Sequence, residues 1–163
     1  MKVCAIVGSV NRKELEAYKD GKFSSALKSR LYSRLESLIL EENVGHFLCG
    51  MSAGPEMLAS EAILELKKKY PRISLESVIP YEAQAARWNE ELRDRYFNIA
   101  ACCDQETMLQ KHYSPDCLDR QDLYMIGKAD IVLFARPHPA RRSAKELSSA
   151  RELGKTVADI AYP

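Results

Sequence analysis

The chain has 163 residues, 46% of them hydrophobic and 29% charged, an ordinary composition for a globular protein. Its 24 basic and 23 acidic residues leave a formal charge of +1, which argues against a chain built mainly to bind nucleic acid or anionic membrane. The length predicts a single domain over residues 1–163, with a core large enough to fold without metal or disulfides. The five cysteines contain no C-x-x-C pair, so neither a zinc motif nor a disulfide framework is indicated.

The N-terminal apolar stretch is too short for the core of a signal peptide, and no apolar run approaches the roughly 18 residues of a membrane span. We therefore expect a cytoplasmic protein without a membrane partner.

Short apolar runs alternate with amphipathic segments along the chain. In order, we predict a strand over 2–7, a helix over 22–42, a strand over 45–50, a helix over 57–66, a strand over 73–79, a helix over 84–101, a strand over 105–110, a helix over 118–127, a strand over 130–135, a helix over 143–153 and a strand over 156–160. The alternation indicates βαβ units and therefore an α/β fold. We expect a Rossmann-like, doubly wound, mostly parallel sheet with helices on both faces.

Such sheets bind ligands outside the carboxyl ends of their strands, which selects the loops that can carry chemistry. The first of them is long and contains Gly8, Ser9 and Arg12. Gly8 permits close backbone approach to a ligand, and Arg12 can pair with a phosphate or a carboxylate. A surface loop with a solvated arginine explains the same residues.

The second loop is a glycine-bearing turn from strand to helix that contains Gly50, Ser52, Gly54 and Glu56. Turns of this kind present backbone N–H groups and a helix N-terminus to an anion. It is neither a G-x-G-x-x-G nor a Walker A loop. Glu56 suits the first turn of a helix but is a poor neighbour for a phosphate, unless it faces a ribose hydroxyl.

The third loop combines Pro80, Tyr81, Gln84 and the single tryptophan, Trp88. Trp88 is explained better as a core or lid anchor than as a platform for a nucleobase, although an aromatic edge at a crevice can stack a base. The fourth loop, residues 136–143, carries three arginines and a histidine. Arg136, Arg141 and Arg142 can bind phosphate through their side chains, and Ser143 can do so or cap the following helix; a mobile basic turn explains the same residues.

Catalytic constellations are sparse. His46, His112 and His138 have no metal-ligand spacing, so no metal site is predicted, and no G-x-S-x-G turn is present. Buried small hydrophobes account for Cys4 and Cys49 better than nucleophiles do.

The segment Cys49–Glu56 with Glu61 and Ala62 resembles the S-G-M-A-x-G-x-D…A-A-E-A motif of the YpsA-like family. That family belongs to the SLOG superfamily, with the Smf/DprA DNA-processing proteins and the LOG cytokinin-riboside phosphate hydrolases. Further matches follow in the same order over nearly the whole chain: Leu66–Pro71, Ile79–Tyr81, Gln84, Trp88, Arg95–Tyr96, Tyr113–Pro115, Cys117, Tyr124–Met125 and Asp130.

The resemblance implies a Rossmann-like domain that binds nucleotides or nucleotide-derived molecules over the strand ends. It implies ligand-binding roles for the following positions: Gly8, Arg12, Gly50, Ser52, Gly54, Glu56, Pro80, Gln84 and Trp88. The family's G-G-T segment falls on Arg141-Arg142-Ser143. Either guanidinium groups bind the phosphate in place of the glycine backbone, or the site is degenerate. The P-G-G-x-G-T-x-x-E signature of the LOG hydrolases is missing, which weakens an enzymatic interpretation.

Four hypotheses follow. The first is a cytoplasmic, sensor-type domain for a nucleotide or another small anionic metabolite, which is the only cofactor-like ligand expected. The second is a nucleoside phosphate N-glycosidase-like enzyme with Glu56 as its carboxylate; the absence of a recognisable catalytic set favours binding over catalysis. The third is nucleic-acid binding, which the net charge disfavours. The fourth is a protein-interaction module with a degenerate pocket. Related folds often self-associate, so a homo-oligomer is compatible with the first and the last.

Overall fold

Strands from along the whole chain lie side by side in one parallel sheet. The computed structural model describes residues 1–136 and 141–160, and for residues 141–143 it describes the backbone alone. The strands are β1 (Lys2–Val7), β2 (Val44–Gly50), β3 (Ser74–Ile79), β4 (Gln105–Met108), β5 (Ile131–Phe134) and β6 (Thr156–Asp159). All neighbours pair in parallel in the order β4-β3-β2-β1-β5-β6. The predicted doubly wound α/β sheet is confirmed.

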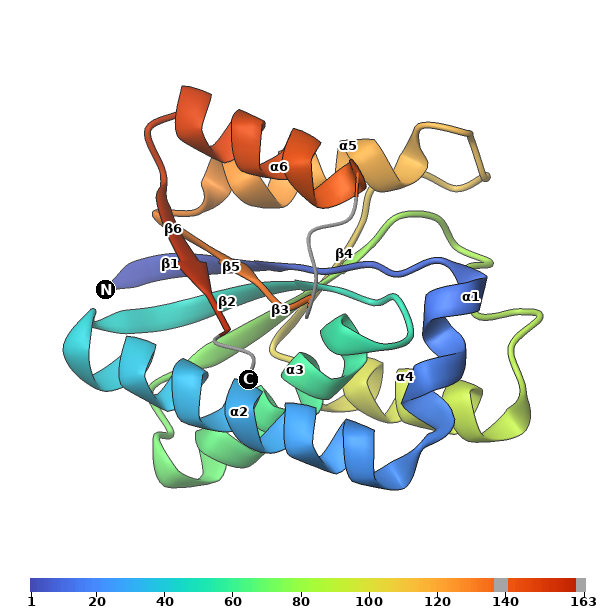
Figure 1. Ribbon diagram of the computed structural model, residues 1–163, viewed down its shortest axis with the longest axis horizontal. Coiled ribbons are helices and arrows are strands. Elements are labelled where there is room, and N and C mark those ends of the chain that lie inside the picture. The colour runs from blue at the N-terminus through green and yellow to red at the C-terminus, as the bar shows by residue number, and fades with distance from the viewer. Residues whose placement is uncertain (137–140, 161–163) are drawn as a thin grey trace.

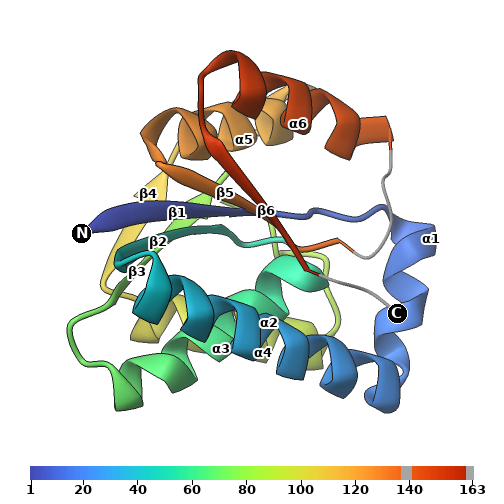
Figure 2. The same cartoon turned by 60° about the vertical axis from the view of Figure 1, so that its left-hand side comes forward.

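The helices form two layers, one on each face of the sheet (Figures 1 and 2). Their bounds are α1 (Arg12–Leu15), a 3₁₀ turn η1 (Glu16–Lys19), α2 (Gly21–Glu41), α3 (Pro55–Lys69), α4 (Glu90–Cys102), α5 (Cys117–Lys128) and α6 (Arg141–Glu152). Helices α2, α3 and α4 cover one face, and α5 and α6 cover the other. No helix among the described residues is long and apolar enough to cross a membrane.

Strand β1 joins the two halves of the hydrophobic core. Cys4 and Ile6 belong to the cluster under α2, α3 and α4, whereas Ala5 and Val7 belong to the cluster under α5 and α6. All four side chains are fully buried, because alternate residues of a strand point to opposite faces and both faces are covered.

Two segments differ from the sequence prediction. The helix expected over 84–101 begins only at Glu90, because Asn89 caps it by accepting a hydrogen bond from the N–H of Leu92 at 2.9 Å. Residues 80–88 instead form successive turns, in which the N–H of Gln84 donates to the carbonyl of Tyr81 at 3.2 Å. The first loop contains α1 and η1, which are too short to show a hydrophobic period in the sequence.

A buried carboxylate joins three strands to α5. Glu76 of β3 is 3% exposed; its Oε1 accepts hydrogen bonds from Thr107 Oγ1 at 2.8 Å and from the Tyr124 hydroxyl at 3.1 Å. Its Oε2 lies 3.1 Å from Nε2 of His46, whose Nδ1 lies 2.7 Å from Ser74 Oγ. Burial by itself raises the pKa of Glu76, but the hydrogen bonds from Thr107, His46 and Tyr124 outweigh it and hold the pKa below its ordinary value.

This network predicts an acid-dependent contribution to stability. Because the pKa of Glu76 is lower in the folded state, the ionised carboxylate stabilises the fold above the ordinary glutamate pKa of about 4.3, and the contribution is lost as the pH falls through the folded pKa. We expect Glu76→Gln to lower the free energy of unfolding by about 1–3 kcal/mol at pH 7, and the deficit to shrink between about pH 5 and pH 3. Urea unfolding over that range measures it. Glu82→Gln, at an exposed position, is the control; a deficit for Glu76→Gln that does not change with pH would contradict the assignment.

Candidate functional site

A pocket of about 740 Å³ lies at the carboxyl end of the sheet. Four segments line it: the α1–η1 segment with the start of α2, the turn between β2 and α3, the segment between β3 and α4 with α4 itself, and the connection from β4 into α5. The helix α1 follows directly on the carboxyl end of β1 (Figure 1). The volume is within the range of about 300–1,000 Å³ that is usual for small-molecule sites.

The pocket brings together six of the residues that the sequence singled out: Arg12, Ser52, Gly54, Tyr81, Gln84 and Trp88. Five others are buried behind these surfaces and do not line the pocket: Gly8, Ser9, Gly50, Glu56 and Pro80. The side chains of Arg141, Arg142 and Ser143 lie outside the described part of the chain, as do residues 137–140 of the fourth loop.

The turn between β2 and α3 is shaped by a buried carboxylate of the protein itself. Glu56 is 0% exposed, and its Oε2 accepts a hydrogen bond from the N–H of Ser52 at 3.1 Å. A Cβ atom at Gly50 would collide with this same oxygen. Gly50 therefore leaves room for Glu56, and one N–H group of the turn is already used inside the protein. The position of Glu56 gives no support to the glycosidase hypothesis, which needs this carboxylate over a bound sugar.

Gly54 sets the direction in which the chain enters α3. Its φ of 101° and ψ of −133° lie in a region that favours glycine, and a Cβ atom there would stand 3.0 Å from Cγ2 of Val10. Pro55 then occupies the first turn of α3. The turn thus packs directly on the first loop, which places Val10 and Gly54 together in the pocket wall.

Aromatic side chains form much of another wall. Tyr81 packs edge-to-face on Tyr113, with ring centroids 5.4 Å apart, and Trp88 packs in the same manner on buried Tyr96 at 5.4 Å. Burial raises the pKa of Tyr81, so its hydroxyl stays protonated at neutral pH. Trp88 is half-buried against the core and also lines the pocket, a position that suits both an anchor and a platform for a nucleobase.

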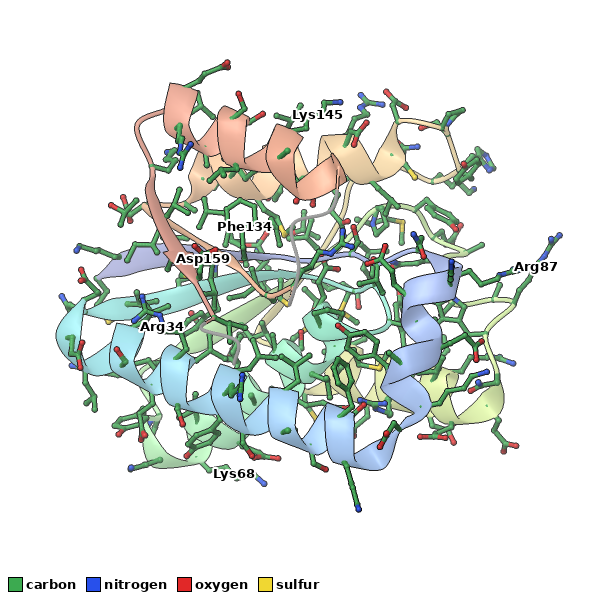
Figure 3. The ribbon with its side chains drawn as sticks, viewed as in Figure 1. Arg34, Lys68, Arg87, Phe134, Lys145 and Asp159 are labelled. Carbon is green, nitrogen blue, oxygen red and sulfur yellow. The ribbon has the colours of Figure 1, made fainter. Side chains whose placement is uncertain are left out.

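Four cations border the pocket, and two of them are neutralised within the protein. Lys19 pairs with Glu16 at 2.9 Å, and Arg95 forms a two-pronged pair with Glu61 at 2.7 and 3.0 Å. Arg12 and Arg87 have no acidic partner among the described residues. The Arg87 side chain extends from the rim away from the body of the molecule (Figure 3), which leaves Arg12 as the cation nearest to the role predicted for it.

Gln84 brings a buried amide to the pocket wall. The residue is 8% exposed, and its Oε1 has no hydrogen-bond donor within reach in the described chain. A buried amide oxygen without a donor costs about 1–3 kcal/mol, so the pocket holds an acceptor that a ligand N–H or O–H can satisfy.

The core cysteines Cys4 and Cys49 carry no nucleophilic character. Burial raises the pKa of Cys4 to about 12 and raises that of Cys49 as well, the latter with a further contribution from the nearby Glu56 carboxylate. Both are therefore neutral thiols inside the core, as the sequence indicated. Within the described residues, no group of His, Cys, Asp and Glu side chains is arranged to hold a metal ion.

Several pocket residues were not selected as ligand contacts from the sequence. Tyr113 comes from the connection between β4 and α5, Cys117 and Leu118 come from the first turn of α5, and Tyr18 and Lys19 come from η1. Tyr113 and Cys117 belong to the motif order that indicated the family, so that order was the available signal. The residues of η1 gave no such signal in the sequence, because a four-residue turn has no periodic hydrophobic pattern.

Comparisons with known proteins identify the family and the fold. A sequence profile of the YpsA family of SLOG proteins matches residues 6–144. A UPF0398 protein of Bacillus pumilus is 31% identical over 136 residues, which cover 82% of this chain and 72% of the relative. A UPF0398 protein of Brevibacillus brevis is 32% identical over 111 residues, which cover 67% of this chain and 59% of the relative, so the matched segment spans less than two thirds of that protein.

Among solved structures, DNA processing protein A (DprA) of Streptococcus pneumoniae superposes with a TM-score of 0.59 at 13% identity. The superposition covers 100% of this chain and 51% of that one, and at this identity it bears on the fold alone. The sequence motifs, the profile match and the relatives agree on the family, and the chain belongs to the YpsA family of SLOG proteins.

Proposed function

We propose that the chain binds a nucleotide or a nucleotide-derived metabolite in the pocket at the carboxyl ends of β1, β2 and β3. The observation that carries this proposal is the buried Oε1 of Gln84, an acceptor without a donor in the described chain on the wall of a pocket of about 740 Å³. A side-chain amide offers both a donor and an acceptor, which matches the edge of a nucleobase. A sensor-type binding domain needs no catalytic set, and we recognise none among the described residues of the pocket wall.

The surroundings of Gln84 suit the other parts of such a ligand. Tyr81, Trp88 and Tyr113 present aromatic surface to a planar base. Arg12 provides positive charge for a phosphate, and the hydroxyl of Ser52 is at the same wall. The buried Glu56 already accepts the N–H of Ser52, so the side chains rather than the turn carry the recognition of the anion.

Substitution can separate the role of Arg12 in ligand binding from that of its neighbour on α1, Lys13. Both Arg12 and Lys13 are exposed cations, but only Arg12 lines the pocket. In a thermal-shift screen of nucleotides, dinucleotides and sugar phosphates, a ligand at about 100 times its Kd should stabilise the fold by about 2.7 kcal/mol. For such a ligand, Arg12→Ala should raise the Kd by about tenfold or more, because a charge-assisted hydrogen bond is worth about 1.5–3 kcal/mol. Lys13→Ala should leave it within about twofold. Equal effects of the two variants would show that only general charge is sensed.

The free-energy cost of the unsatisfied Gln84 amide can be tested by removing it. Gln84→Leu removes a buried acceptor without a donor, so the unliganded protein should lose less than about 1 kcal/mol of stability or gain some. The same variant should weaken binding of the ligand found in the screen by about tenfold or more, because the ligand donor is then left unpaired. Chemical unfolding and isothermal titration measure the two effects. Unchanged binding, or a large loss of stability without ligand, would contradict the role proposed for Gln84.

A further inference from the structure

A second position on the same edge of the sheet lies outside the pocket. The strand order β4-β3-β2-β1-β5-β6 runs one way from β1 to β4 and the other way from β5 to β6, so the direction of winding reverses between β1 and β5. Open α/β sheets hold ligands at such a reversal. The ends of the two strands are adjacent here, since the N–H of Ala135 donates to the carbonyl of Val7 at 2.9 Å.

Arg136 leaves β5 at this point and is buried. Its side chain is only 6% exposed, and its Nη2 pairs with the carboxylate of Glu14 on α1, which is 122 residues earlier in the sequence. Its Nε is buried and has no acceptor within the described residues. A buried guanidinium with an unused N–H is costly, and a planar fork of this kind is best satisfied by two oxygens of one anion.

The loop that leaves β1 supplies a second unsatisfied group. Ser9 is 7% exposed, and its Oγ has no hydrogen-bond partner in the described chain. Gly8 lets this loop lie against β5, because a Cβ atom there would stand 3.2 Å from Cβ of Ala135 and 3.3 Å from Cγ of Arg136. Two buried polar groups without full partners therefore flank the same strand ends.

We propose that Arg136 and Ser9 form a binding site for a phosphate group, and that the carboxylate of Glu14 occupies it as a built-in competitor. The competitor is easily displaced: the Glu14 side chain is 36% exposed, and α1 has no buried residue. When Glu14 leaves, its charge returns to water, whereas the buried Arg136 needs another anion. The site does not depend on the pocket, which neither Arg136 nor Ser9 lines.

Displacement of Glu14 from Arg136 would affect the pocket through α1. Arg12, on the pocket wall, and Glu14, at Arg136, are two residues apart on this four-residue helix. A phosphate that takes the place of Glu14 removes the ion pair that ties α1 to β5, so the segment 11–19 gains freedom.

The decisive titration uses inorganic phosphate against the intact chain at constant ionic strength. Glu14→Gln should bind phosphate at least about fivefold more tightly than the wild type, because the competing charge is gone. Glu82→Gln, which removes an exposed carboxylate outside the site, should leave the affinity within about twofold. Arg136→Gln should abolish the binding. Equal phosphate affinity for the wild type and Glu14→Gln, or phosphate binding retained by Arg136→Gln, would overturn the proposal.

A measurement on the wild type keeps the test valid if a variant folds poorly. Phosphate should speed amide hydrogen exchange in residues 11–19 and leave the exchange of α5 unchanged. No change in 11–19 with phosphate bound would refute displacement.

A nucleoside monophosphate and its nucleoside, titrated alongside inorganic phosphate, identify the source of the phosphate group. Arg136-dependent binding of the monophosphate that is tighter than that of inorganic phosphate points to a phosphate ester, and equal Arg136-dependent affinity for the two points to the free ion. Binding of the nucleoside tests the pocket separately, so failure of one proposal is distinguishable from failure of the other.

Discussion

Burial of β1 on both faces, together with pairing on both of its edges, is the constraint on which the rest of the molecule depends. Cys4 to Val7 pack into the core above and below the sheet, and β2 and β5 pair with the strand on either side. The chain leaves this strand at its carboxyl end, beside the carboxyl ends of β2 and β5. The pocket and the surroundings of Arg136 both lie next to the point where the chain leaves β1.

The turn after β2 shows how a family motif can serve packing as much as a ligand. Gly50 makes room for the buried carboxylate of Glu56, and that carboxylate takes up the N–H of Ser52. A glutamate at this position therefore replaces, inside the protein, the anion that a glycine-bearing turn before a helix is suited to bind. The cations that we propose for the two sites come from other segments, with Arg12 on α1 and Arg136 after β5.

The sequence predicted the fold well where hydrophobic periodicity is long, and less well where structure depends on single polar groups. Leu27, Leu31 and Leu35 recur at helical spacing, and α2 follows from them. The start of α4 depends instead on the cap at Asn89, and the pattern over 84–88 looks equally helical without it. Of the candidate site, the turn glycines and the aromatic residues could be found from their place after strands. The pair between Glu14 and Arg136 could not, because nothing in a single sequence relates two charges 122 residues apart.

The segment from α1 to η1 is held by an ion pair, by a few local contacts and by partly buried Leu15 and Tyr18, which pack against the core. Neither element has a buried residue. At one end Glu14 pairs with Arg136; at the other, the hydroxyl of Ser24 donates to the carbonyl of Tyr18 at 2.7 Å, and Tyr18 packs edge-to-face on Phe23. Apolar packing responds weakly to anions, whereas the ion pair at the strand end is exposed to competition from an anion that reaches the arginine. Because this segment is also a wall of the pocket, the charge state of one strand end and the shape of the neighbouring site are physically linked.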